Sequence, residues 1–572
     1  MWRLRSIRNF PILGLILAAW LLAALAAEAQ QCPTSESAPQ ALAPVTLFGS
    51  NNQYLRYNNQ TIPLIGLSSE YLCHVAQPGT AFGGTVTPDQ AYCTWANYKA
   101  FINRLQQSGL NVLRLWVGLN HSPGRERGIG GPYPNEQPFV FNSVTGLWDL
   151  NSPDPVYWER LKCVIGYAGT KDVIVELTLF DPWSGNWTTG PWHSSRNSQG
   201  IGFSAERFFA RFVNDPTKND DMTNTPIRQE QLDLVQHAVQ QLNAYPNLIW
   251  ELANEADLPW SSSAAPAGAE AARWMDRIAQ IVQQEEALPG RLQHLIEVNF
   301  HTQTAINQLL APGTNPSLAG ADVVAAHYVT VEPAKGDYGA IELIRAKHGT
   351  SGFTTRAFGF NETRSTPTPS IPSSARSEAW EFALNEGGLY DNYNLQFRNA
   401  SGVVHADTNK VFNQLGVLKS FLLGLTGGIG AMSRDACGAG CWLTGQGPYK
   451  NLEATTCTRP DSTIWRGSKY WAAMHSANAY VAYFHHSVDT ASPSNAFSRY
   501  EPPPAGCPVS YQETGTQFKP DVLGTYIAEW MNPVSGAVLA SHNLGSVGAG
   551  VTVNVPSSPT YVYDIALRVR KQ

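Results

Sequence analysis

Residues 247–257 read Asn-Leu-Ile-Trp-Glu-Leu-Ala-Asn-Glu-Ala-Asp, so an apolar run leads almost directly into an amide beside a carboxylic acid. We predict a short strand at 248–252 that is buried on both faces and presents Asn254-Glu255 at its end. A second stretch, 357–362, reads Ala-Phe-Gly-Phe-Asn-Glu and again stops on a carboxylate. Because each glutamate follows the end of an expected strand, we infer that both belong to one site.

Strand-like and helical segments alternate along most of the chain. The expected strands cover 62–67, 112–117, 173–179, 248–252, 295–298, 323–326, 357–360 and the Gly-rich 428–432. The expected helices cover 87–107, 154–167, 227–244, 267–287, 304–310 and 341–348, with others from 377, from 410 and over 462–483. About eight strand–helix units predict an α/β fold, a (β/α)8 TIM barrel, in which the residues that end the strands line the active site.

The last part of the chain changes character, because residues 521–570 are rich in Val, Thr, Tyr, Ser and Gly. Strand-like runs at 526–530, 537–541, 551–555 and 561–567 predict a C-terminal antiparallel β-sandwich. An early hairpin within 45–67 is a candidate for additional strands of that sandwich. The predicted domains are a signal peptide (1–29), an N-terminal segment and β-hairpin (30–61), the barrel (62–487), a connecting segment (488–520) and the β-sandwich (521–572).

The N-terminus carries the features of an export signal. Three arginines within the first eight residues precede an apolar run over 10–27, and residues 27–29 (Ala-Glu-Ala) offer small side chains for cleavage. We therefore expect a protein that is secreted, periplasmic or on the cell surface. The alternative is an uncleaved anchor, the one case in which the membrane would be a partner.

Eight cysteines in an exported chain predict up to four disulfides. The candidates by proximity in sequence are Cys73 with Cys93, and pairs among Cys437, Cys441, Cys457 and Cys507. The spacing of Cys437 and Cys441 is not that of a zinc site, and no histidine lies close by, so no metal is expected there.

The charge balance narrows the class of ligand. The formal net charge is −6 and only 15% of the residues are charged, whereas nucleic-acid phosphates demand clustered Lys and Arg. We therefore expect no nucleic-acid partner, an uncharged substrate, no metal or organic cofactor, and a monomer.

An uncharged substrate and two strand-end glutamates fit the cleavage of a glycosidic bond. That reaction needs one carboxylic acid to protonate the leaving oxygen and a second carboxylate to attack or to activate water. The residues resemble the clan A retaining glycoside hydrolases, and within that clan the cellulase-like family five and its relatives. There the acid/base follows an Asn at the end of the fourth strand, and a nucleophilic Glu ends the seventh.

The resemblance covers about residues 45–485 and implies roles for the matching residues. Glu255 would be the general acid/base, Glu362 the nucleophile, and Asn254 a hydrogen-bond donor to the sugar 2-hydroxyl. The expected reaction is the cleavage of a β-linked carbohydrate by double displacement, with retention of configuration.

Three more residues match the same family pattern. Arg114, on the second strand, would hold Glu362 ionised, since a nearby guanidinium lowers the pKa of a carboxyl group. His327 and Tyr328 end the sixth strand and would line the site, and Tyr328 would orient Glu362.

Aromatic and acidic residues near the expected strand ends are further candidates for sugar contact. They are Trp183, Trp187 and Trp192 in the loop after the third strand, Asp181 and His193 beside them, Glu70 after the first strand, and Trp442 past the eighth. The alternative for the tryptophans is that they pack the loop against the barrel. Glu176, Glu251 and Glu297 lie inside expected strands, so we predict structural ion pairs for them.

A second class of function fits the same architecture. A surface carbohydrate-binding or adhesion protein could use the barrel as a scaffold without catalysis, because a fold does not determine a function. Glycan hydrolysis by the wild type but not by Glu362→Ala distinguishes the enzyme from the binding protein.

Overall fold

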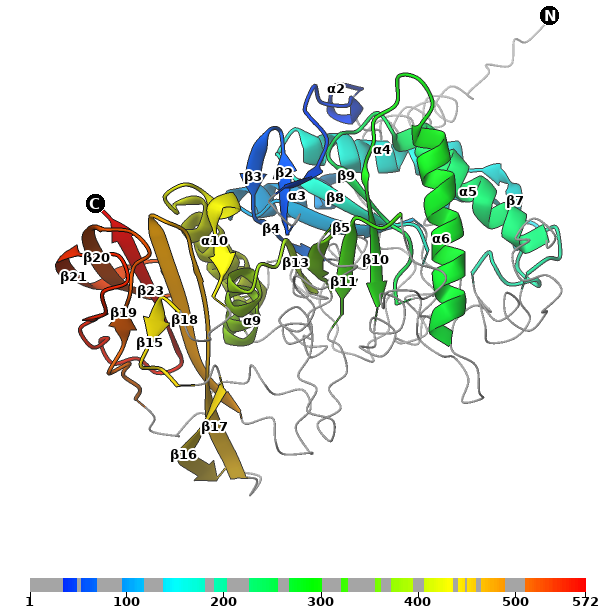
Figure 1. Cartoon of the computed structure of the whole chain (residues 1–572). Coiled ribbons are helices and arrows are strands. Elements are labelled where there is room, and N and C mark those ends of the chain that lie inside the picture. Colours follow the sequence, from blue (N-terminus) through cyan, green and yellow to red (C-terminus); the bar gives the residue numbers. More distant parts are fainter. Residues whose placement is uncertain are drawn as a thin grey trace, which may run out of the picture.

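The computed structural model contains a closed eight-stranded barrel and a C-terminal β-sandwich (Figure 1). The structure describes residues 34–48, 53–68, 95–117, 137–180, 190–202, 226–255, 267–300, 320–327, 355–361, 372–393, 406–435, 441–447, 450–458, 464–488 and 510–572. No helix within these ranges combines the length and the apolar character needed to cross a membrane.

Eight parallel strands close the barrel in the order of the chain. They are β4 (Leu64–Ser68), β5 (Val112–Trp116), β8 (Ile174–Thr178), β9 (Leu248–Glu251), β10 (Leu295–Phe300), β11 (Val323–Ala326), β12 (Ala357–Phe360) and β13 (Leu389–Tyr393). Pairing of β13 with β4 completes the ring. The predicted (β/α)8 barrel is confirmed, and β9, β11 and β12 are its fourth, sixth and seventh strands.

Helices cover the outside of the barrel (Figure 1). They are α3 (Trp95–Gln107), α4 (Pro155–Gly169), α5 (Pro226–Leu242), α6 (Ala267–Glu286), α9 (Pro372–Leu384) and α10 (Ala406–Leu423); α2 (Thr34–Ser37) and a hairpin of β6 (Phe139–Asn142) and β7 (Leu147–Pro153) are additions. The predicted start of α4 is confirmed, because the Asp154 side chain accepts the N–H groups of Val156 and Tyr157. The expected helices at 304–310 and 341–348 lie outside the described residues.

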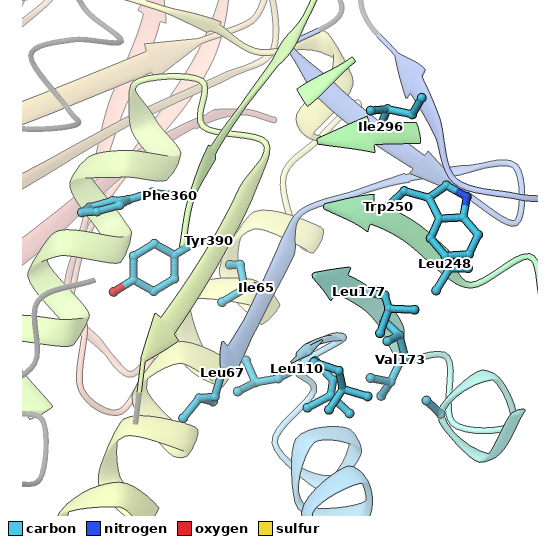
Figure 2. Close-up of a cluster of buried hydrophobic side chains, with 14 of the residues drawn as sticks. Ile65, Leu67, Leu110, Val173, Leu177, Leu248, Trp250, Ile296, Phe360 and Tyr390 are labelled. Atoms are coloured by element: carbon cyan, nitrogen blue, oxygen red, sulfur yellow. The ribbon is translucent and has the colours of Figure 1, made fainter. Parts of the chain in front are cut away.

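The strands and helices pack through one apolar core. Ile65, Leu177, Trp250, Ile296, Phe360 and Tyr390 are among the strand side chains that belong to it (Figure 2). Phe382 of α9 packs against Phe360 and Tyr390, with ring centroids 5.6 Å and 6.0 Å away. Burial on both the helix side and the barrel side explains why the strands read as short apolar runs.

A separate small sheet closes the N-terminal end of the barrel. It consists of β1 (Thr46–Phe48), β2 (Tyr54–Tyr57) and β3 (Gln60–Ile62). Leu55 and Tyr57 of this sheet cluster with the residues that begin the barrel strands, namely Leu64, Val112, Ile174, Ile249, Leu295, Val323, Ala357 and Leu389. The expectation that the hairpin extends the sandwich is therefore wrong, because its apolar side chains cover the end of the barrel instead.

The C-terminal sandwich consists of two antiparallel sheets. The larger contains β14 (Ser433–Arg434), β16 (Lys450–Thr458), β17 (Ile464–His475), β18 (Ala479–Val488), β20 (Gly524–Met531), β21 (Val538–Val547) and β23 (Asp564–Lys571); the smaller contains β15 (Leu443–Thr444), β19 (Gln517–Phe518) and β22 (Val553–Asn554). The larger sheet begins well before residue 487. The predicted limits of the barrel (62–487) and of the sandwich (521–572) are corrected accordingly.

Two further predictions fail in this half of the chain. Within the expected helix 462–483, residues 464–475 form β17 and residues 479–483 form the first half of its partner β18. The eighth barrel strand is β13, whereas the Gly-rich 428–432 contains the 3-10 turn η5 (Ile429–Ala431). In both cases the short-range pattern was ambiguous and strand pairing decided the structure: β17 pairs with β18, β18 with the distant β23, and β13 with the first barrel strand.

Helix α9 joins the barrel to the larger sheet. Arg376 makes a two-point ion pair with Asp564, with Nε to Oδ2 at 2.7 Å and Nη2 to Oδ1 at 2.9 Å. Trp380 stacks on Tyr483 of β18 at 5.2 Å between ring centroids. Because side chains of this sheet also belong to the barrel core, the two parts share buried surface.

Candidate active site

The two motifs that end in glutamate follow the fourth and the seventh barrel strands. Glu255 comes four residues after the end of β9, and Asn361 directly follows β12. Because all eight strands are parallel, their C-terminal ends meet at one rim of the barrel. Glu362, the residue after Asn361, lies outside the described residues, so its predicted approach to Glu255 stays a prediction.

Four ionisable side chains occupy the interior of the barrel below this rim. Arg114 on β5, Glu176 on β8, Glu251 on β9 and Glu297 on β10 are all fully buried. Arg114 binds Glu251 through Nε at 2.6 Å and Nη2 at 2.5 Å, and its Nε lies 3.3 Å from Oε1 of Glu176. The predicted ion pairs of Glu251 and Glu176 are confirmed.

The carboxyl group of Glu251 accepts hydrogen bonds from three neighbouring side chains. Arg114 donates to both of its oxygens, Thr178 Oγ1 donates to Oε2, and Asn299 Nδ2 donates to Oε1. A buried carboxylate needs such donors to offset its lost hydration. The predicted contact of Arg114 with Glu362 lies outside the described residues.

Glu255 is almost fully buried, and its carboxyl group is held by a histidine. Oε1 of Glu255 lies 2.7 Å from Nδ1 of His327, which directly follows β11. The backbone N–H of Glu255 donates to Oδ1 of Asn299 at 2.6 Å. Asn254, the preceding residue, accepts from Nη2 of Arg114 at 2.9 Å. Four residues predicted for the site, Arg114, Asn254, Glu255 and His327, are thus brought together.

Asn361 connects the seventh strand to two buried carboxyl groups. Its Nδ2 donates to Oε1 of Glu176 at 2.5 Å and to Oε1 of Glu297 at 2.8 Å. Burial raises the pKa of Glu176 well above its usual value, and the charges of Glu297 and Glu251 add to this against the opposing effect of Arg114. Burial, followed by the charge of Glu251, likewise raises the pKa of Glu297. Glu297 was predicted to form an ion pair, but it is a carboxyl group that burial favours in its protonated form.

Replacing Glu297 by glutamine tests this protonation. The folded protein retains a proton on Glu297 that the unfolded chain releases above about pH 4.5, so stability falls as the pH rises from that value towards the folded-state pKa. Glu297→Gln removes the penalty, which amounts to about 1.4 kcal/mol for each pH unit within that window. We expect urea unfolding to show a more stable variant at pH 7 and equal stabilities near pH 4.

The control is Glu159→Gln, because the Glu159 side chain is 68% exposed. That variant should match the wild type at both pH values. A Glu297→Gln protein that is less stable than the wild type at pH 7 would contradict a protonated Glu297.

Trp442 is not a residue of this site. It is buried in the second apolar cluster, inside the sandwich, with its ring 5.4 Å from that of Tyr480 and 6.1 Å from that of Phe518. The prediction that Trp442 contacts the sugar is wrong, because a ring enclosed by the sandwich core presents no face to a ligand. The error follows from the misplaced eighth strand.

The remaining candidates divide into two groups. Glu70, Asp181, Trp183, Trp187 and Tyr328 lie outside the described residues, and their roles stay predictions. Trp192 is buried and packs edge to face on Phe139, with ring centroids 5.3 Å apart, and beside Phe180 at 5.9 Å. For Trp192, packing of the loop against the barrel is therefore the correct alternative.

Asn299, Asn361 and Thr178 belong to the site but were not predicted. A signal for them is present in the sequence, because Glu297 and Asn299 alternate with Ile296, Val298 and Phe300 along one strand. Polar side chains at a spacing of two inside an otherwise apolar strand share one face. In a closed barrel, that face is the interior.

Among the described residues, no group of three or more His, Cys, Asp or Glu is arranged to hold a metal ion.

Comparison with known proteins supports the fold. No family model matches the sequence, and no curated protein matches it. A solved glycoside hydrolase family 5 structure from Bacteroides vulgatus ATCC 8482 aligns with a TM-score of 0.52 and 11% identity, over 92% of this chain and 93% of its own. A second structure, named as a glycoside hydrolase, aligns with a TM-score of 0.53 and 12% identity, over 93% of this chain and 97% of its own. At these identities the likeness shows the fold alone.

Proposed function

We propose that this protein is an exported glycoside hydrolase that cleaves β-linked glycans by double displacement, with retention of configuration. Glu255 is the general acid/base and Glu362 is the nucleophile. The observation that carries this proposal is the cluster at the rim, in which His327 holds the carboxyl group of Glu255 while Arg114 anchors Asn254 beside it.

In the first step, a carboxylate oxygen of Glu362 attacks the anomeric carbon. The bond from that carbon to the leaving oxygen breaks, and the leaving oxygen takes the proton of Glu255. In the second step, Glu255 takes a proton from water while the water oxygen attacks the anomeric carbon and releases Glu362. The two inversions give net retention, and both carboxyl groups return to their starting protonation states.

The hydrogen bonds around Glu255 are consistent with its role as general acid/base. The bond from His327 occupies Oε1 and sets the plane of the carboxyl group. Arg114 occupies Oδ1 of Asn254, which directs the Nδ2 amide to other partners, as a donor to a sugar hydroxyl requires. Glu255 and Asn254 are held by His327 and Arg114, which are side chains of the protein itself, so this arrangement suits an uncharged substrate.

Export is part of the same proposal. The arginines and the apolar run within residues 1–29 support a cleaved secretory signal. Cys163 in α4 takes part in a disulfide, which suits a chain that matures in an oxidising compartment. Secretion therefore agrees with a polymeric carbohydrate substrate outside the cell.

Product analysis on a panel of plant and microbial β-glycans tests the function. We expect the purified protein to release sugars from at least one of them, and NMR of the first products should show the same anomeric configuration as the substrate. Initial products of opposite configuration would contradict double displacement. Binding to glycans without release of sugars from any would overturn the enzyme and favour the carbohydrate-binding protein.

A further inference from the structure

Glu255 has a backbone conformation that glutamate rarely adopts. Its φ is 46°, in the left-handed region where a side chain crowds its own backbone. A residue keeps such a conformation only where its surroundings determine it, and such residues cluster at functional sites. The groups that bind the backbone of Glu255 are therefore part of how its carboxyl group is aimed.

Asn299 binds that backbone directly. It lies near the end of β10 and is fully buried, and its Oδ1 accepts the N–H of Glu255 at 2.6 Å. Its Nδ2 donates to Oε1 of Glu251. Because one partner is a donor and the other an acceptor, only one orientation of the amide satisfies both.

The amide of Asn299 also ties Glu255 to the ion pair beneath it. Glu251 is bound by Arg114, and Arg114 in turn donates to Asn254. The Asn254-Glu255 pair is thus held at two points, by Asn299 at the backbone of Glu255 and by Arg114 at the side chain of Asn254. Both contacts are made by buried side chains, so water competes little for the hydrogen bonds.

We propose that Asn299 is a positioning residue for proton transfer by Glu255. Through the N–H of Glu255 it keeps the left-handed backbone in place, so that the carboxyl group, bound at Oε1 by His327, faces the leaving oxygen of the glycoside. Asn299 acts through Glu255 and does not itself contact the substrate. This inference rests on the proposed function and deepens it.

The test uses two substrates of the wild-type enzyme that differ only in the leaving group. A sugar leaving group needs a proton from Glu255, whereas a dinitrophenolate leaves without one. Misplacement of a catalytic group by about 1 Å costs about 100-fold in rate. We expect Asn299→Ala to lower kcat/KM by about ten- to 100-fold for the sugar leaving group, and by less than about threefold for dinitrophenolate.

Asn243→Ala is the matched control. Asn243 is another buried asparagine whose amide bridges two partners, Glu286 and the backbone of Leu292, but it lies at the other end of the barrel, near the start of β10. This variant should lose stability without changing the ratio of kcat/KM between the two substrates. If Asn299→Ala lowers kcat/KM by one common factor for both substrates, the positioning role is refuted.

Asn299→Asp provides a second variant of nearly the same shape if the alanine variant does not fold. Aspartate keeps an acceptor for the N–H of Glu255, but as a carboxylate it offers no donor to Glu251 and adds a charge beside Glu251 and Arg114. We expect its kcat/KM for the sugar leaving group to approach the wild-type value at acidic pH and to fall at lower pH than in the wild type. A pH profile parallel to that of the wild type would refute the role.

The same assays separate this inference from the function on which it depends. If the loss of kcat/KM depends on the leaving group in Glu255→Ala but not in Asn299→Ala, the proposed function stands and the positioning role of Asn299 fails. If the wild type hydrolyses no glycoside, the proposed function fails and the role of Asn299 falls with it.

Discussion

Glu255→Ala is expected to lower kcat/KM for glycans with a sugar leaving group by about 10²- to 10⁴-fold, the contribution that a general acid typically makes. The same variant should retain most of its kcat/KM for a dinitrophenyl glycoside, because that bond breaks without a proton. Its kcat should still fall, since Glu255 also has to activate water in the second step. Rates for both substrates, measured on one preparation, check the two statements together.

Azide supplies a second readout for Glu255→Ala. Once the acid/base is absent, a small anion that needs no deprotonation can attack the covalent intermediate in place of water. We expect azide to raise kcat for the dinitrophenyl glycoside and to give the glycosyl azide with retained configuration. Glu159→Ala, at an exposed position of α4, should show neither effect. A Glu255→Ala enzyme within twofold of the wild type on both substrates would exclude Glu255 as the acid/base.

Arg114→Met is expected to cost about 3–5 kcal/mol of unfolding free energy, the usual loss when one partner of a buried ion pair is removed. Methionine fills part of the space, but Glu251 and Glu176 lose the guanidinium between them. Asn254 also loses its donor. Urea unfolding of the variant and the wild type at pH 7 measures the loss.

A double-mutant cycle isolates the ion pair from the rest of the loss. Adding Glu251→Gln to Arg114→Met removes the carboxyl group that Arg114 binds at two points, so the double variant should be more stable than Arg114→Met alone. The control is Arg104→Met on α3, because Arg104 bonds the exposed Asn409 and Asn413 and should cost less than about 1 kcal/mol. An Arg114→Met protein as stable as the wild type would show that this arginine does not hold the barrel interior.

The barrel was predictable because its signal is local and repeated. The strands are short and apolar, and among the described residues helices follow six of them; Asp154-Pro155 gives α4 a clear start signal. The order of the strands follows from the chain, since consecutive parallel strands pair with one another. The strand ends at Asn254-Glu255 and at Phe360-Asn361 therefore came out in their correct positions.

The sandwich was harder to predict because its central strands are buried on both faces. In β17, Trp471 and Ala473 face the smaller sheet, while Ala472 and Met474 join the barrel core. With both faces apolar, the alternation of a half-exposed strand disappears, and the run resembles a buried helix. The misread limit of the barrel and the misplaced Trp442 both follow from this.

By itself, the sequence determined seven of the eight barrel strands and the strand ends that carry Asn254-Glu255 and Asn361, because a residue's place along a strand depends only on its neighbours in the chain. Only the tertiary structure decided which partner each buried polar side chain binds. Glu251 pairs with Arg114, and Asn299 accepts the backbone N–H of Glu255. Asn361 donates to Glu176 and Glu297. These partners lie 44 to 185 residues apart, and closure of the barrel brings them within hydrogen-bonding distance. Several buried carboxyl groups compete there for few donors, so their pairing depends on three-dimensional geometry that no local pattern encodes.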